Sequence, residues 1–390
     1  MAYPGLQTLK DRVNTLAELE QKLLAYVENI SGDDELLSKA LLDHVEAIDL
    51  KSCIYMFSAF LHLIACISIT RPGVQSLNSK ISSLLLILQT KYDFKSMFPP
   101  TIIFDMFERN KLMLLYLYQI GIIDLETLKK KMYSELFIYF FPEIKEADPT
   151  YFRIQGENYY ISKACQYLDN IDEFKRLREE GHSEDPVSKL IRNDDLNAFI
   201  DFLSKNNYSL DSMIGSSIFE PNAEIRFSGP SVIEYAMIFG SINIFKYLWA
   251  NKIKVSRSSL RYSIIGGNLE IIHILADESN YEFNDECLQK CVLYHHDNIL
   301  EYLLTEKNVA FRNVYGQGTD QIHNMLIKFN FIHFARFLRE NNDETVVQHF
   351  TRDVVANFSV STMTIFLQFL LGLNENYLSA KDHGLFSHIS

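Results

Sequence analysis

The stretch "SLRYSIIGGNLEIIHIL", residues 259–275, has the pattern of two short helices joined by a glycine turn. Apolar residues recur three and four positions apart on both sides of Gly267, which is the spacing of a buried helical face. Glycine adopts a positive φ without a Cβ clash, so it can end the first helix and let the chain reverse. The stretch therefore predicts a helical hairpin.

Two neighbouring stretches repeat this spacing, "EYAMIFGSINIFKYL" (234–248) and "QKCVLYHHDNILEYL" (289–303). All three share a small residue, a turn residue four positions later, then an isoleucine and a leucine. These positions are Ala236, Gly240, Ile244 and Leu248; Ser263, Gly267, Ile271 and Leu275; and Cys291, His295, Ile299 and Leu303. The small residues are 27 positions apart (236 to 263) and then 28 (263 to 291). A short fixed period predicts stacked helix pairs that share their aliphatic side chains with their neighbours.

Weaker copies extend the pattern on both sides. They are Cys165, Asp169, Glu173 and Leu177; Ile191, Asp195, Phe199 and Leu203; and Leu326, Asn330, Phe334 and Leu338. Before them the sequence has helical spacing throughout, and no alternating strand pattern bounded by hairpin turns occurs.

We therefore predict an all-α protein in three parts. A helical N-terminal domain covers residues 1–160, and an ankyrin-like helical repeat stack, or α-solenoid, covers 161–343, with its best copies at 231–308. Capping helices and a tail cover 344–390, because the open end of a repeat stack has to be covered.

The repeat positions resemble those of ankyrin repeats, whose consensus reads T-P-L-H-x-A-A-x-x-G-x-x-x-I-V-x-x-L-L. The copy "SVIEYAMIFGSINIFKYLW" (231–249) keeps the consensus residues Ile233, Ala236, Gly240, Ile244 and Leu248. Together with a preceding helical region that contains "FFPEIK" (140–145), the chain is similar to a protist-type family in which a helical domain of unknown function precedes divergent ankyrin-type repeats. The resemblance implies a scaffold that presents a surface to a protein partner.

Three features depart from the ankyrin pattern. The T-P-L-H tetrapeptide is replaced by "SVIE", "SSLR" and "ECLQ". His295 stands where the other two strong copies have glycine, although histidine is poorly suited to a left-handed turn. The period of 27 or 28 is shorter than the ankyrin repeat of about 33 residues, and the missing residues belong to the projecting hairpin fingers.

Composition limits the function classes. The 390 residues carry a formal net charge of −13, with a pI near 5.4, which argues against a broad nucleic-acid footprint. The five cysteines are too few and sparse for a disulfide framework, and no secretory signal is visible, so cytoplasm is the default expectation. We expect a monomer. The uncharged stretch 53–70 favours a buried core helix, with membrane attachment through it as the alternative.

Local clusters give weak indications of chemistry. Cys287, Cys291 and His295 are spaced along one helical face, and thiolates with imidazole suit zinc. The repeat pattern already explains Cys291 and His295 as packing residues, so we favour that interpretation. The common nucleotide, zinc-protease, hydrolase and calcium motifs are missing from the sequence. We therefore predict no enzyme and no cofactor, with a hydrolase or metal-binding protein, its site between the helical domain and the repeats, as the alternative.

One apolar row predicts a binding surface. In ankyrin repeats the residues just before the turn line the concave face and are usually polar. Here the corresponding row, with two neighbouring tyrosines, consists of Tyr235, Ile238, Phe239, Tyr262, Ile265, Leu293 and Tyr294. An exposed apolar row marks an interface, so we predict that it contacts an unidentified protein partner. The alternative is that other helices of the same chain cover it.

Overall fold

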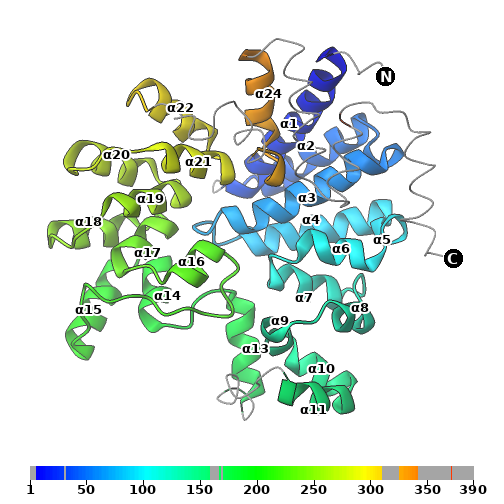
Figure 1. Cartoon of the computed structure of the whole chain (residues 1–390), viewed down its shortest axis with the longest axis horizontal. Helices are drawn as coiled ribbons and strands as arrows, with labels where there is room; N and C mark the ends of the chain where they lie inside the picture. The colour runs from blue at the N-terminus through cyan, green and yellow to red at the C-terminus, as the bar shows by residue number, and fades with distance from the viewer. Residues whose placement is uncertain are drawn as a thin grey trace. The chain divides into compact units, whose positions relative to one another are not determined.

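The computed structural model describes residues 6–29, 32–158, 167, 170–309, 325–340 and 370. Their regular structure is helical, which confirms the predicted all-α class (Figure 1). Within these ranges the β contact is limited to one isolated bridge between Met213 and Ser231. The predicted capping helices at 344–390 lie outside the described residues, apart from Leu370.

The chain forms two compact units, and each is discontinuous in sequence. Unit 1 consists of Met1–Thr70, Ser79–Pro99 and Phe283–Ser390, and unit 2 of Arg71–Asn78 and Pro100–Glu282. The first two strong repeat copies belong to unit 2 and the third to unit 1. The boundaries at 160 and 343 stay a prediction.

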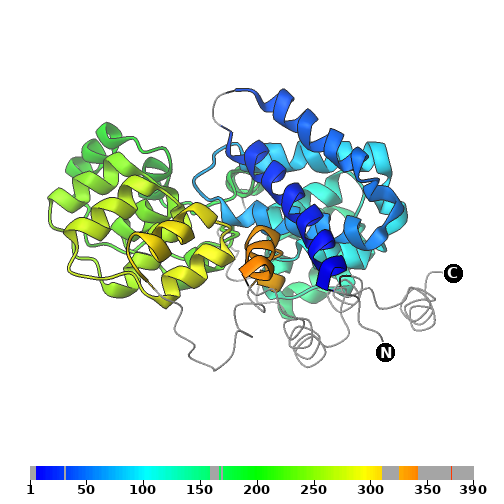
Figure 2. The same cartoon turned by 90° about the horizontal axis from the view of Figure 1, so that it is seen from above.

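The helices of unit 1 come from both ends of the chain. They are α1 (Leu6–Glu28), α2 (Asp34–Ala47), η1 (Leu50–Ser52), α3 (Ile54–Thr70), α4 (Leu77–Tyr92), α5 (Phe94–Met97), α21 (Asp285–Leu293), α22 (Asp297–Thr305) and α24 (Phe331–Glu340). Helices α1 and α24 lie side by side (Figure 2), although they are far apart in sequence. The apolar stripe along α1 is fully buried, at Leu9, Val13, Leu16, Leu19, Leu23 and Val27.

The helices of unit 2 include the first helix pairs of the repeat. They are α6 (Pro100–Phe107), α7 (Lys111–Gln119), α8 (Leu125–Lys130), α9 (Ser134–Tyr139), α10 (Phe141–Ala147), α11 (Pro149–Asn158), α13 (Ile171–Glu180), α14 (Pro186–Arg192), α15 (Leu196–Asn206), α16 (Ala223–Ser228), α17 (Val232–Phe239), α18 (Ile242–Ala250), η3 (Arg257–Ser259), α19 (Leu260–Gly266) and α20 (Leu269–Glu278). The pairs α14/α15, α17/α18 and α19/α20 follow one another as successive hairpins (Figure 1).

The predicted turn position is confirmed in the three strong copies. Gly240, Gly267 and His295 have φ values of 66°, 69° and 56°, in the left-handed region. The isoleucine four residues later is fully buried in each copy. Helical hairpins with a left-handed turn therefore recur at the predicted spacing.

The two weak copies that the structure describes turn one residue earlier than predicted. The positive φ falls on Asp194 and Phe329 (50° and 55°), not on Asp195 and Asn330. Asp195 caps α15 through the backbone N–H of Ala198, and Asn330 accepts from the N–H of His333. Aspartate and asparagine are favoured both in turns and at helix N-caps, so the sequence pattern does not separate the two positions. The first two positions of the weak copy at Cys165 lie outside the described residues.

Hydrogen bonds link the turn of one helix pair to the next in unit 2. The Asp194 carboxylate accepts from the backbone N–H groups of Asn243 and Ile244, both at 3.0 Å, and so caps α18 in place of its own N-cap residue. Asn268 caps α20 and donates its Nδ2 to the carbonyl of Gly240 at 2.9 Å. Each turn thereby satisfies backbone groups of its neighbour.

The segment that replaces T-P-L-H also connects neighbouring helix pairs. Ser231 and Glu234 form a capping box at the start of α17. Glu234 in addition accepts a 2.6 Å hydrogen bond from Ser259 Oγ of the next pair. The segment that replaces T-P-L-H therefore also begins its helix with side-chain hydrogen bonds, but different side chains make them.

Within the apolar stretch 53–70, Ile54–Thr70 forms α3, whose side chains are largely buried. Across the described ranges, no helix is both long enough and apolar enough to cross a membrane.

Because α17 packs closely on α19, we predict that Gly266 cannot be replaced by a larger residue without loss of stability. A Cβ there would lie 2.0 Å from the Met237 carbonyl oxygen, so Gly266→Ala should lower the free energy of unfolding by at least about 2 kcal/mol. Gly215→Ala is the control, because a Cβ at that position meets no atom within 4 Å. Chemical denaturation of both variants measures the difference, and an equal effect would contradict the packing described.

Candidate functional site

The predicted binding row is buried. Tyr235, Ile238, Phe239, Tyr262, Ile265 and Tyr294 belong to the core, and Leu293 is half-buried. The prediction of an exposed row is therefore replaced by its alternative, in which the chain covers these side chains itself.

Parts of unit 2 that are remote in sequence cover the start of this row. The turn at Gly73 packs so closely that a Cβ there would lie 2.7 Å from the Phe239 carbonyl oxygen. The His182 ring lies edge-on against the Phe239 ring, with centroids 5.3 Å apart. Arg192 donates a 3.1 Å hydrogen bond to the Tyr235 hydroxyl. These contacts are non-local, which is why the repeat pattern by itself suggested exposure.

The cysteine and histidine set is packed in the interior of unit 1. Cys287 and Cys291 are buried, and burial followed by the neighbouring Cys287 raises the pKa of the Cys291 thiol well above its usual value. Nδ1 of His295 lies 2.6 Å from a carboxylate oxygen of Glu20. Among the residues that the structure describes, no three His, Cys, Asp or Glu side chains are grouped to hold a metal ion.

Glu20 of α1 is instead the centre of a buried polar site in unit 1. Its side chain is fully buried; one oxygen faces His295, and the other accepts from the backbone N–H groups of Phe331 and Ile332 at 2.6 and 2.9 Å. A carboxylate at a helix N-terminus satisfies free N–H groups and interacts favourably with the helix dipole. Glu20 therefore holds both the α21/α22 turn and the start of α24.

The sequence contains a faint signal for Glu20. It falls on the apolar stripe of α1, between Leu16 and Leu23, where a charged side chain has to find a buried partner. The partner is 275 positions away in sequence, so spacing alone does not reveal it.

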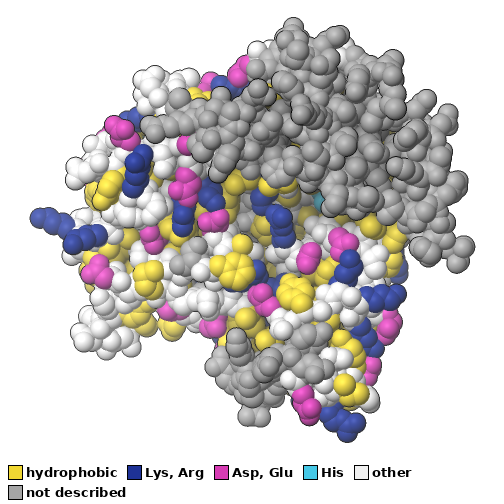
Figure 3. Space-filling view, in the orientation of Figure 1, with side chains coloured by type: hydrophobic (Ala, Val, Ile, Leu, Met, Phe, Trp, Pro, Cys, Tyr) yellow, Lys and Arg dark blue, Asp and Glu magenta, His cyan; other side chains and the backbone are white. Residues whose placement is uncertain are grey.

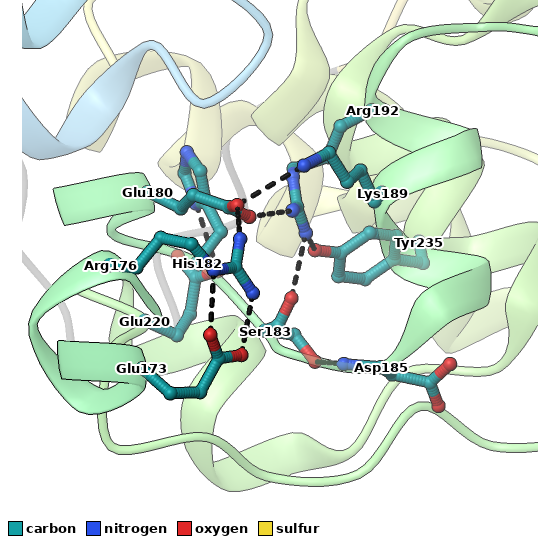
Figure 4. Close-up of polar contacts among 10 residues, drawn as sticks. All are labelled: Glu173, Arg176, Glu180, His182, Ser183, Asp185, Lys189, Arg192, Glu220 and Tyr235. Atoms are coloured by element: carbon teal, nitrogen blue, oxygen red, sulfur yellow. Dashed lines mark hydrogen bonds and ion pairs between the residues drawn. The ribbon is translucent and has the colours of Figure 1, made fainter. Parts of the chain in front are cut away.

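A second polar cluster lies in unit 2 around Arg192 (Figure 4). The Arg192 guanidinium donates to the Ser183 carbonyl and the Tyr235 hydroxyl at 3.0 and 3.1 Å, and lies 3.8 Å from the Glu180 carboxylate. Beside it, Nδ1 of His182 lies 3.2 Å from the buried Glu220 carboxylate. The cluster joins the α13/α14 loop, α14, α17 and the 207–231 connection.

Burial keeps the Tyr235 phenol protonated. Desolvation, reinforced by the Glu220 carboxylate, raises the phenol pKa far above its usual value, although Arg192 acts in the opposite direction. A neutral phenol can accept from Arg192, as the geometry shows. The cluster thus ties buried elements together.

A third group of charged side chains extends from the interior of unit 2 towards its surface. Lys111 Nζ of α7 lies 2.5 Å from Glu135 Oε1, and the same oxygen lies 3.1 Å from Arg226 of α16. Desolvation lowers the pKa of the buried Lys111 to about 8, against the opposing effect of Glu135. The Arg226 guanidinium in turn stacks on the Phe227 ring, 4.3 Å from its centroid.

Phe227 is exposed despite its size. It is 73% exposed and Tyr133 is 37% exposed. Burial, followed by the carboxylates of Glu135 and Glu108, raises the pKa of the Tyr133 phenol, and Arg226 opposes this, so Tyr133 shares the charged surroundings of Arg226. We call Tyr133, Arg226 and Phe227 the Phe227 patch. No motif or spacing in the sequence points to this patch. On the face drawn in Figure 3, side chains of both charges are interspersed with scattered hydrophobic ones.

A family model matches part of the chain. An ankyrin-associated family described as a domain of unknown function (DUF3447) matches residues 250–338, from the end of α18 into α24. No curated protein and no solved structure matches the chain.

Loss of the Glu20 charge should destabilise the fold. Glu20→Gln removes the anion that faces His295 and the two N–H groups of α24, so we expect the free energy of unfolding to fall by about 2–4 kcal/mol. Glu18→Gln is the matched control, since Glu18 lies on the same helix with an exposed side chain; its effect should stay within about 0.5 kcal/mol. Thermal and chemical denaturation compare the two, and similar losses would refute the role of Glu20.

Acid should destabilise unit 1 through His62. Burial lowers the pKa of His62 to about 4, from 6.5, while its ring stacks on Phe329. Between these pH values the unfolded chain binds a proton that the folded chain does not, so stability falls as pH drops through this window. His62→Phe should weaken this pH dependence of the melting temperature between pH 7 and pH 4 while keeping the stack. His273→Gln, at an exposed histidine, should leave the dependence unchanged.

Proposed function

We propose that the chain is a non-catalytic protein–protein interaction scaffold whose helix pairs are divergent ankyrin-type repeats. The left-handed turns at the predicted spacing and the match to an ankyrin-associated domain support this proposal. Stacked helix pairs form a rigid surface, and such surfaces commonly bind proteins.

The polar clusters indicate that the buried charged side chains serve to stabilise the fold. Arg192, Glu20 and Lys111 are each held by partners within their own unit. A buried ion pair that is fully engaged fixes the geometry of the elements that carry it. Such clusters make the units rigid, which lowers the entropic cost of binding a partner.

The single observation that carries the proposal is the exposed Phe227 on the 207–231 connection. A large apolar side chain that is 73% exposed loses stabilisation in water unless another molecule covers it. Its neighbour Arg226 is fixed by Glu135, so the ring is presented from an ordered position. Aromatic and arginine side chains are the residue types most enriched in binding hot spots. We propose this connection as the binding surface, in place of the buried row.

Partner capture tests the scaffold function. Tagged wild-type protein and Phe227→Ser are each used for affinity purification from the native cell, and we expect the variant to lose a protein that the wild type retains. Leu36→Ser is the control, because Leu36 is 66% exposed on α2 in unit 1 and the substitution has the same character. An identical set of captured proteins for all three would contradict the proposal.

A further inference from the structure

We propose that α24 is a proton-sensitive latch, which detaches from α1 and α3 in mild acid while the other helices of unit 1 stay folded. The proton acceptors are two histidines, His62 of α3 and His333 of α24. The segment that detaches is Phe329–Glu340, the helix with the left-handed turn before it. This device is separate from the scaffold function and does not depend on it.

Three contacts hold the N-terminal end of α24, and α1 packs along the helix. The Phe329 ring stacks on the His62 ring, with centroids 4.7 Å apart and planes inclined by 7°. Asn330 donates its Nδ2 to the Val292 carbonyl at 2.9 Å. The Glu20 carboxylate accepts from two backbone N–H groups of the first turn. The stack is therefore part of the attachment, and its imidazole can change charge.

Both histidines lie where the folded chain does not accommodate a proton. Nε2 of His62 is buried without a hydrogen-bond partner, and so are both ring nitrogens of His333, whose side chain is only 6% exposed. A charged imidazole has two N–H donors, which need acceptors or water. The Phe329 ring attracts a cation weakly. A buried charged N–H without an acceptor costs more than this attraction supplies, so protonation favours the state in which both imidazoles meet water.

The neighbouring charges do not cancel this preference. Burial lowers the pKa of both histidines to about 4; at His333, Arg336 adds to the effect and Glu340 opposes it. On α1, the Glu20 carboxylate faces His295 as well as α24. A proton on His295 would strengthen its attraction to Glu20. The α21/α22 turn is therefore expected to stay attached when α24 leaves.

The direction and size of the effect follow from proton linkage. Once α24 detaches, both histidines regain the ordinary pKa of 6.5, so the open state binds protons that the closed state does not. The closed state is fully stable above pH 6.5 and loses stability as the pH falls towards 4. Between pH 8 and pH 5 each histidine should raise the opening constant by about 30-fold, and the two together by close to a thousandfold.

Hydrogen–deuterium exchange of the full chain tests the latch. Protection factors of the amides of Phe331–Glu340, corrected for the intrinsic exchange rate at each pH, should fall by about a hundredfold or more between pH 8 and pH 5. Those of α3, which carries His62 but does not detach, should fall by less than about threefold.

Variants identify the proton acceptors. His62→Phe combined with His333→Leu keeps apolar side chains in both places, and should limit the loss of α24 protection to less than about fivefold. His62→Phe alone should reduce the loss by about 30-fold, which serves as the test if the double variant does not fold. His273→Gln, at an exposed histidine of unit 2, should behave as the wild type. Melting temperatures at pH 8 show which variants are folded.

Two results would overturn the inference. If α3 and α24 lose protection together, acid opens unit 1 as a whole and α24 is no latch. If α24 keeps the wild-type pH dependence after His62→Phe and after the double substitution, other groups take up the protons.

Discussion

The left-handed residue at each helix turn is the constraint on which the repeat depends. Glycine meets it without steric cost at Gly240 and Gly267, but Asp194, His295 and Phe329 meet it with a Cβ in place. Each of these three side chains makes a contact that a glycine would lack. Asp194 caps α18, His295 faces Glu20, and Phe329 stacks on His62. The strain of the left-handed turn is thus offset by these contacts, which also fix the helices that pack against the turn.

This coupling explains why segments far apart in sequence, α1 to α3 and α21 to α24, meet in unit 1. The third strong copy has lost its turn glycine, and the weak copy after it turns at Phe329. Helices α1 and α3 supply the side chains that receive these turns, Glu20 and His62. The N-terminal helices therefore do more than precede the repeats, because they provide the neighbours that repeat units need to bury their faces.

The sequence predicted the features of the fold that are local. The repeat period of the sequence predicts the helix pairs and the turn positions of the strong copies. It also predicts the buried Ile244, Ile271 and Ile299. Exposure could not be predicted in the same way. Whether Tyr235 or Phe239 meets water depends on Arg192, His182 and the turn at Gly73, and no spacing rule connects these residues to the row. The clusters around Glu20 and Arg192 escaped prediction for the same reason.

The connections between helix pairs are where the chain can change to suit a new partner. The helix faces and turns of the described repeats are occupied by contacts that stabilise the fold, so changing them for a new partner would cost stability. The connection between α15 and α17, residues 207–231, spans more of the sequence than the 251–259 connection between α18 and α19. It is held at Glu220 by the His182 ring and at Arg226 by the Glu135 carboxylate. Phe227, which directly follows Arg226, can be presented to a partner without loosening the stack that supports it.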